Sequence, residues 1–130
     1  MNLSRLLIFA VVLVWSSCGK DDPEPEQVCM QADWVGTYTG TAVCDGTSDD
    51  ATVTITASGM DQIIIEYATS TLTTTFDPLT VEGCDLERTA TLGGVTASVS
   101  ATLDGDDLSL NDMISGAGFD SDCMVTATRQ

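Results

Sequence analysis

Acidic side chains are the groups of this chain that could do chemistry, and they gather in two clusters. The clusters are Asp104, Asp106 and Asp107 with Asp112 beyond them, and Asp45 with Asp49 and Asp50. Carboxylates in loops suit hard cations such as Ca²⁺, but neither cluster has the Asp-x-Asp-x-Asp-Gly spacing and distal Glu of an EF-hand loop. Aspartate is also a common turn residue, because its side chain bonds the nearby backbone. We therefore interpret both clusters as solvated turns and predict no metal site and no cofactor.

Enzymatic chemistry is restricted because the chain contains no histidine. Without histidine there is no Ser-His-Asp triad, no Cys-His pair and no His-ligated metal. Two carboxylates could hydrolyse a glycosidic bond, but that reaction needs a cleft of substrate size, which a short-looped chain rarely provides. We predict that the protein is not an enzyme and has no catalytic residue.

The charge excludes another class of function. The 130 residues include 20 acidic and 4 basic side chains, and the formal net charge is −16. Binding to nucleic acid depends on Lys and Arg side chains that neutralise phosphates, so this chain would repel DNA and RNA. The length allows one domain.

Residues 1–17 have the layout of a signal peptide. A short start with one cation, Arg5, precedes a ten-residue apolar run over 6–15 and then small residues. As a helix that run is about 15 Å long, half of a bilayer core of roughly 30 Å, so it is too short to span a membrane. We predict export into an oxidising compartment, where disulfide bonds persist.

The residues that end the signal peptide resemble a known motif. The sequence Trp-Ser-Ser-Cys, which ends at Cys18, resembles the lipobox of bacterial lipoproteins. The resemblance implies cleavage before Cys18 and acylation of its thiol and of the new amino terminus, with fatty acids such as palmitate. Because two or more acyl chains give a stable anchor, the partner expected here is the membrane.

The segment after Cys18 resembles a second signal. Lys20, Asp21 and Asp22 resemble the Lys-acidic-acidic export signal of Bacteroidota surface lipoproteins. The resemblance implies an outer-membrane protein that faces the cell exterior. Residues 18–27 contain two prolines and four acidic residues, a composition that stays extended, so we expect a lipidated acidic tether there. A single β domain then covers residues 28–130.

Four cysteines remain once Cys18 is lipidated. They are Cys29, Cys44, Cys84 and Cys123. No two of them have the close spacing of zinc ligands, and no histidine can complete a zinc site. We therefore expect two disulfide bonds, for which three connectivities exist.

Threonine alternates with apolar residues through most of the domain, and this period of two predicts β-strands. We expect strands over 35–43, 51–57, 62–69, 72–76, 79–81, 86–92, 95–103, 108–110 and 123–128, separated by turn dipeptides such as Asp45-Gly46 and Asp77-Pro78. No window predicts a helix, and 110–119 is too irregular to assign. The inner face is assigned to Ala42, Val53, Ala57, Ala90, Ala97, Val99 and Ala101.

Short connections imply sequential antiparallel pairing, so the fold is predicted to be all-β, a meander of about eight strands. It closes as a small barrel or folds as a two-sheet sandwich. The segment from Trp34 to Tyr38 resembles the first strand of lipocalin-like bacterial domains, in which a Trp near a Gly plugs the base of the barrel. In either architecture we expect Trp34 to anchor the core.

Closure of a barrel also bears on the cysteines. In an up-and-down barrel the first and last strands pair antiparallel, so Cys44 at the end of the first strand would lie beside Cys123 at the start of the last. This favours Cys44–Cys123 and leaves Cys29–Cys84. The alternative is Cys44–Cys84 with Cys29–Cys123.

Two functions remain open. The first is a non-catalytic surface module that binds a small ligand, a glycan or a partner protein. The second is an accessory or structural envelope lipoprotein with no ligand. The small inward residues are compatible with a cavity or with a thin core, and the sequence does not identify a ligand-binding residue.

Overall fold

The structure is a computed structural model, and it describes residues 27–130. The predicted signal peptide, the lipidation site Cys18 and the export signal at Lys20, Asp21 and Asp22 lie outside the described residues. The elements are α1 (Gln31–Trp34), β1 (Gly36–Cys44), β2 (Thr47–Ala57), β3 (Gln62–Ala68), β4 (Thr73–Thr80), β5 (Asp85–Leu92), β6 (Val95–Asp104), β7 (Asp107–Gly116) and β8 (Phe119–Arg129). Within 27–130 no helix has the length and apolar character needed to cross a membrane.

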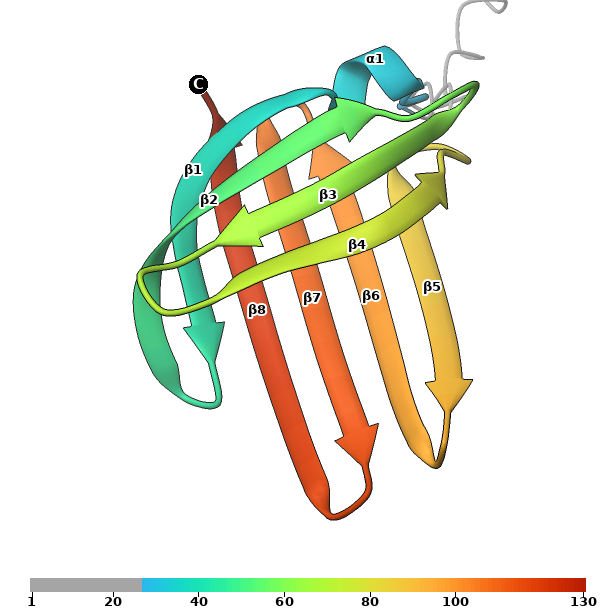
Figure 1. The fold of residues 1–130 in the computed structure, drawn as a ribbon. Coiled ribbons are helices and arrows are strands. Elements are labelled where there is room, and N and C mark those ends of the chain that lie inside the picture. The colour runs from blue at the N-terminus through green and yellow to red at the C-terminus, as the bar shows by residue number, and fades with distance from the viewer. Residues whose placement is uncertain (1–26) are drawn as a thin grey trace, which may run out of the picture.

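The eight strands form one antiparallel sheet in the order β4-β3-β2-β1-β8-β7-β6-β5 (Figure 1). The first strand pairs with the last, from Tyr38 opposite Arg129 to Cys44 opposite Cys123. The sheet therefore curls into a barrel that is closed between β1 and β8 and open between β4 and β5. The predicted all-β meander that closes as a barrel is confirmed, and the sandwich alternative is not adopted.

Period-two alternation explains the buried face of each strand. On β3 the side chains of Ile63, Ile65 and Tyr67 are fully buried, and on β2 Val53 and Ile55 are buried in the same way. The threonines between the apolar residues of β2 lie on the outer face, where β-branched side chains suit a strand without needing a core.

Several predicted strand boundaries are wrong. β2 begins at Thr47 instead of 51, and β8 runs over Phe119–Arg129 instead of 123–128. The segments 72–76 and 79–81 form the single strand β4, without a turn at Asp77-Pro78. The register between β3 and β4 shifts between Ile63 and Ile65, and such an irregularity on an edge strand accommodates a proline that has no N–H to donate. The unassigned region after Leu110 continues β7 to Gly116 and pairs with both β6 and β8.

Three alanines predicted to face the core are exposed: Ala57, Ala90 and Ala97. The predicted burial of Ala42, Val53, Val99 and Ala101 is confirmed. Strands β5 to β8 extend beyond the strands that cross them (Figure 1), so the inner face has no opposite wall at the far end, where Ala90 and Ala97 lie. Ala57 is the last residue of β2. A period of two predicts which face a residue lies on, but not whether that face is covered.

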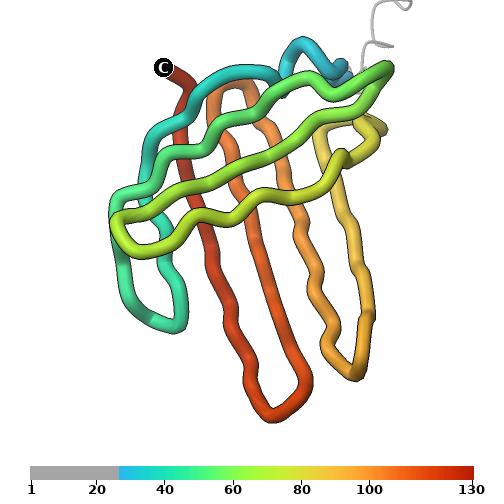
Figure 2. Tube along the Cα trace, viewed as in Figure 1, coloured from blue at the N-terminus to red at the C-terminus, as the bar shows by residue number. Residues whose placement is uncertain are grey.

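The short helix α1 lies over one end of the barrel (Figure 2), although no helix was expected. Its Trp34 is fully buried, and the indole Nε1 donates a hydrogen bond to the carbonyl of Gly83 at 3.0 Å. The Tyr38 hydroxyl donates to the Trp34 carbonyl at 2.9 Å. Trp34 therefore anchors the core at the end of the barrel that α1 covers. This role was predicted for either architecture.

The described residues contain two disulfide bonds, Cys29–Cys84 and Cys44–Cys123. These are the pairs that closure of the barrel favoured. Cys44 and Cys123 are direct partners in the β1–β8 ladder. Cys84 lies in the connection from β4 to β5, so the bond to Cys29 fixes that connection to the segment before α1.

Candidate ligand-binding cleft

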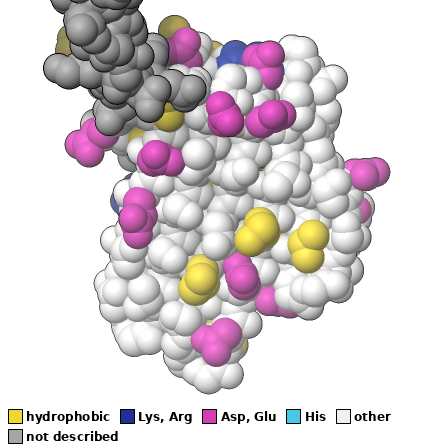
Figure 3. Space-filling model, turned by 180° about the vertical axis from the view of Figure 1, so that it is seen from behind, with side chains coloured by type: hydrophobic (Ala, Val, Ile, Leu, Met, Phe, Trp, Pro, Cys, Tyr) yellow, Lys and Arg dark blue, Asp and Glu magenta, His cyan; other side chains and the backbone are white. Residues whose placement is uncertain are grey.

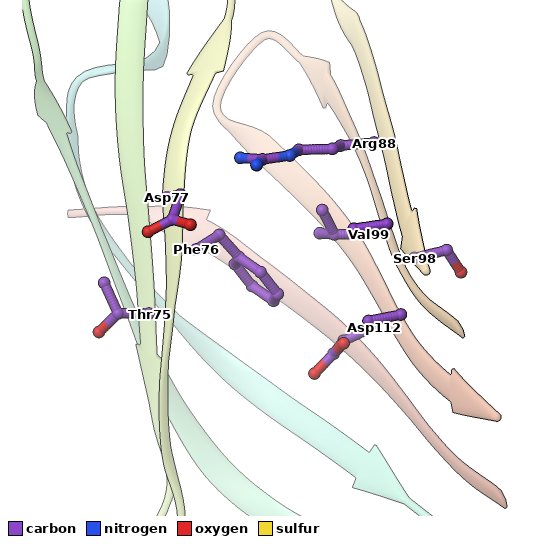
Figure 4. Close-up of a pocket in the computed structure, with 9 residues that line it drawn as sticks. Thr75, Phe76, Asp77, Arg88, Ser98, Val99 and Asp112 are labelled. Carbon is purple, nitrogen blue, oxygen red and sulfur yellow. The ribbon is translucent and has the colours of Figure 1, made fainter. Parts of the chain in front are cut away.

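The opening between β4 and β5 leads into a cleft of about 210 Å³. Its lining comes from four strands: Thr75, Phe76 and Asp77 of β4, Arg88 and Ala90 of β5, Ala97, Ser98 and Val99 of β6, and Asp112 of β7. Phe76 points toward Val99 and Asp112, which are partners in the β6–β7 ladder, whereas Thr75 and Ser98 point away (Figure 4). The cleft therefore has an apolar wall and one buried carboxylate.

Asp112 is the one charged side chain among the described residues that is buried, with 9% of its surface exposed. Its Oδ2 accepts a hydrogen bond of 3.0 Å from the hydroxyl of Tyr67. Tyr67 belongs to β3, which is not a neighbour of β7 in the sheet. The hydrogen bond therefore joins two facing walls across the interior of the barrel.

Burial is the main cause that raises the pKa of Asp112 above its ordinary value. The hydrogen bond from Tyr67 lowers this pKa, and the charge of Asp122 raises it. Burial also raises the pKa of Tyr67, so its hydroxyl remains a donor at neutral pH. The carboxylate has no counter-cation, because the single ion pair among the described residues joins Arg129 to Asp106 at 3.4 Å.

The apolar wall is built on the same tyrosine. The rings of Tyr67 and Phe76 stack with their centroids 6.1 Å apart and their planes at 30°. Phe76 is half-buried, and Val99 is buried opposite it. Ala90 and Ala97 are small and exposed, so they leave space at the mouth.

Arg88 lies at the rim of the cleft. Its side chain extends from β5 across the opening toward β4 (Figure 4), where Nη1 donates to the Pro78 carbonyl at 3.5 Å, a long hydrogen bond. The other arginine of residues 27–130, Arg129, lies at the end of the barrel that α1 covers. Its guanidinium is 5.0 Å from the centre of the Tyr38 ring. Acidic side chains are scattered over the face of the molecule that Figure 3 shows, and with a formal net charge of −16 for the chain, Arg88 lies in a negative field.

Of the carboxylates predicted to lie in solvated turns, those of Asp45 and Asp106 lie in hairpin turns, and those of Asp104 and Asp107 lie at the strand ends beside a turn. The prediction is wrong for Asp49 and Asp50, which lie within β2. Asp45 adopts a positive φ of 49° in the β1–β2 hairpin, and its carboxylate accepts a hydrogen bond of 3.0 Å from the backbone N–H of Asp122. Asp107 accepts one of 2.9 Å from the Thr128 hydroxyl. The hydrogen bonds from Ser70 hold the pKa of Asp49 below its usual range. In residues 27–130 no three acidic or cysteine side chains gather in a way that could hold a metal.

The predicted place of Asp112 in a solvated turn is also wrong, and Asp112 alone among these carboxylates is buried. It lies within β7 on the buried face, because Leu108, Leu110 and Asp112 alternate in register with one another. The same period of two was visible in the sequence and could have identified a carboxylate on an apolar face. What the sequence did not reveal was Tyr67, the partner 45 positions away.

No known protein family matches the chain, and no curated protein matches it. A solved structure of similar fold is a protein of unknown function from the DUF3598 family of the cyanobacterium Nostoc punctiforme. The two share 16% sequence identity with a TM-score of 0.54 over 80% of this chain. The chain spans about half the length of that protein, since the match covers 50% of it. The similarity extends to the fold alone.

Proposed function

We propose that this protein is a non-catalytic binding module, anchored by lipid to the outer membrane and facing the cell exterior, and that it holds a small ligand in the cleft between β4 and β5. The observation that carries the proposal is a buried carboxylate without a counter-cation, set beside an aromatic wall in an accessible cavity. Burial of such a group costs free energy, which a purely structural barrel could avoid with an apolar residue at Asp112.

The open side of the barrel supports the same conclusion. Unpaired strand edges expose backbone N–H and C=O groups and favour aggregation, so closed barrels avoid them. Here β1 and β8 pair along their length, whereas β4 and β5 do not pair. Entry of a ligand between β4 and β5 would explain why these two strands are left unpaired.

A small ligand is favoured over a glycan because aromatic platforms for sugars are scarce. Trp34, Tyr38 and Tyr67 are fully buried, while Phe119 is 54% exposed and Phe76 is half-buried. The alternative remains an accessory or structural envelope lipoprotein with no ligand.

The anchor part of the proposal rests on the resemblance at Cys18, Lys20, Asp21 and Asp22. Two disulfide bonds in the described domain support it, because such bonds persist outside the reducing cytosol. Cys18→Ser should release the protein from the membrane fraction, since acyl chains would hold it there. A Cys18→Ser protein that stays with the membranes would refute the lipid anchor.

Native mass spectrometry of the protein purified from its own host tests the binding function. We expect a bound mass on the wild-type protein. Ala97→Trp should remove that mass by filling the mouth of the cleft, whereas the control Ala57→Trp, which adds the same bulk at an exposed site on β2, should keep it. A wild-type protein without added mass would favour the accessory function.

A further inference from the structure

The chemistry of the cleft indicates what its ligand carries, if the proposed binding function holds. Within residues 27–130, Asp112 receives one hydrogen bond, from Tyr67 to Oδ2, and Oδ1 accepts none. The carboxylate points into the cleft (Figure 4). One acceptor oxygen is thus available to a molecule that enters between β4 and β5.

Among the described residues, no cation forms an ion pair with the Asp112 carboxylate. Asp77 of β4 shares the lining, and Asp122 of β8 acts on Asp112 through its charge. Arg88 of β5 is the one cation in the lining, but its hydrogen bond is to the Pro78 carbonyl, and it makes no ion pair with a described residue. The negative charge of Asp112 is therefore free to attract a charge brought by the ligand.

A cationic ligand would neutralise the negative charge of this site. An ammonium group offers three N–H donors and a positive charge, and a hydrogen bond between charged groups is about twice as strong as a neutral one. The field of a chain with net charge −16 concentrates cations and repels anions. A carboxylate ligand would meet repulsion from both Asp77 and Asp112.

The rest of the cleft suits an apolar body of one ring. The ring of Phe76 lies opposite Asp112 (Figure 4), and the side chain of Val99 lies beside Asp112 as its partner in the β6–β7 ladder. The cleft measures about 210 Å³, and an apolar cavity of about 150 Å³ already holds benzene. The small side chains of Ala90 and Ala97 leave the mouth open to it.

We infer that the cleft binds a small organic cation, in which an ammonium group contacts Asp112 and an aromatic or apolar body packs on Phe76 and Val99. Asp112 is then the residue that determines specificity, and Tyr67 positions its carboxylate from the opposite wall.

Benzylamine and benzyl alcohol test this inference, because they have nearly the same shape and differ in charge. Saturation-transfer NMR titrations of the purified full-length protein near neutral pH measure both affinities. We expect the wild-type protein to bind benzylamine roughly tenfold more tightly or better, the effect of a charged hydrogen bond. Asp112→Asn keeps an acceptor for Tyr67 but removes the charge, so the preference should fall to about one.

Asp120→Asn is the matched control. It makes the same change of charge in the exposed β7–β8 hairpin, outside the cleft, and should keep the preference. Circular dichroism shows whether each variant is folded, and the wild-type ratio of affinities stands even if Asp112→Asn does not fold.

Three results would overturn the inference. Equal binding of the two compounds by the wild-type protein would show that the cleft does not select cations. An unchanged preference in folded Asp112→Asn would show that Asp112 does not determine the specificity, and no binding of benzylamine at tens of millimolar would reject the organic cation. In each case the proposed function is judged separately, by the mass that co-purifies with the protein.

Discussion

The barrel has two seams, one between β1 and β8 and one between β4 and β5, and they are built in opposite ways. At the first seam a continuous ladder runs from Tyr38 opposite Arg129 to Cys44 opposite Cys123, and a disulfide bond joins its end. At the second seam no ladder forms, and the long hydrogen bond from Arg88 to Pro78 lies beside the cleft.

The difference shows how a small domain can separate stability from access. Strands β2, β3, β6 and β8 each bury three apolar side chains, whereas the two strands of the open seam bury one each, Leu79 on β4 and Leu86 on β5. The strands of the open seam thus contribute little to the core, and the cleft that opens there contains the carboxylate of Asp112, whose burial costs free energy. Changes at the closed seam should affect stability more than changes at the open seam do, and changes at the open seam should affect ligand binding more.

The largest effect is expected from the disulfide bond of the closed seam. Removal of the Cys44–Cys123 bond, with both residues changed to Ala, should lower the free energy of unfolding by about 4 kcal/mol, because it frees a loop of 79 positions in the unfolded chain. Urea unfolding of the two proteins measures the loss.

The Cys29–Cys84 bond provides the matched control. Its loop of 55 positions costs almost the same closure entropy, so its removal should agree to within about 1 kcal/mol. A Cys44–Cys123 loss below about 1 kcal/mol would mean that the ladder alone holds the closed seam.

The next effect concerns Gly40, the point where β1 passes closest to β8. A Cβ at this position would lie 1.9 Å from the Thr126 carbonyl oxygen and 2.6 Å from the Cα of Ala127. Gly40→Val should therefore separate the two strands and cost about 3 kcal/mol or more, as overpacking does. Thermal and urea unfolding measure this cost.

Gly46→Ala is the comparison for Gly40→Val. Gly46 has a φ of +83° but nothing within 4 Å of the added Cβ, so the change should cost about 1 kcal/mol through backbone strain alone. Equal costs for the two variants would contradict close packing at the closed seam.

The closed seam was largely predictable from the sequence, because local patterns define its two strands, and closure as a barrel, one of the two predicted architectures, makes the first and last strands neighbours. The alternation of Thr39 and Thr41 with Tyr38 and Ala42 predicted the two faces of β1, and Asp45-Gly46 predicted the hairpin that follows. Antiparallel pairing of the first and last strands then placed Cys44 beside Cys123.

The open seam was not predictable, because its determinants are distant or geometric. The contact of Asp112 with Tyr67 depends on which strands become facing walls of the barrel, and no local pattern encodes that. The exposure of Ala90 and Ala97 depends on how far β5 and β6 extend beyond the opposite wall. Asp77-Pro78 was misleading for a third reason, since an edge strand tolerates a proline that a central strand would not.

The smallest effect on stability is expected at the open seam, and it has the opposite sign. Burial raises the pKa of Asp112, so the folded protein binds this proton more tightly than the unfolded chain does. The resulting stabilisation is present at acidic pH and is lost as pH rises from the ordinary carboxyl range through the raised pKa. Near neutral pH, Asp112→Asn should therefore raise the free energy of unfolding by about 1 kcal/mol, because it removes a buried charge and keeps the acceptor for Tyr67.

Urea unfolding across the acidic range measures this dependence, on protein refolded from denaturant so that no ligand remains. The Asp112→Asn protein should lose less stability than the wild type as pH rises toward neutral. Asp49→Asn is the control of opposite direction, because the Ser70 hydrogen bonds lower the pKa of Asp49, so its contribution is present near neutral pH and lost on acidification. If Asp112→Asn destabilises the protein near neutral pH, the carboxylate stabilises the fold. Its burial then no longer supports a ligand-binding site.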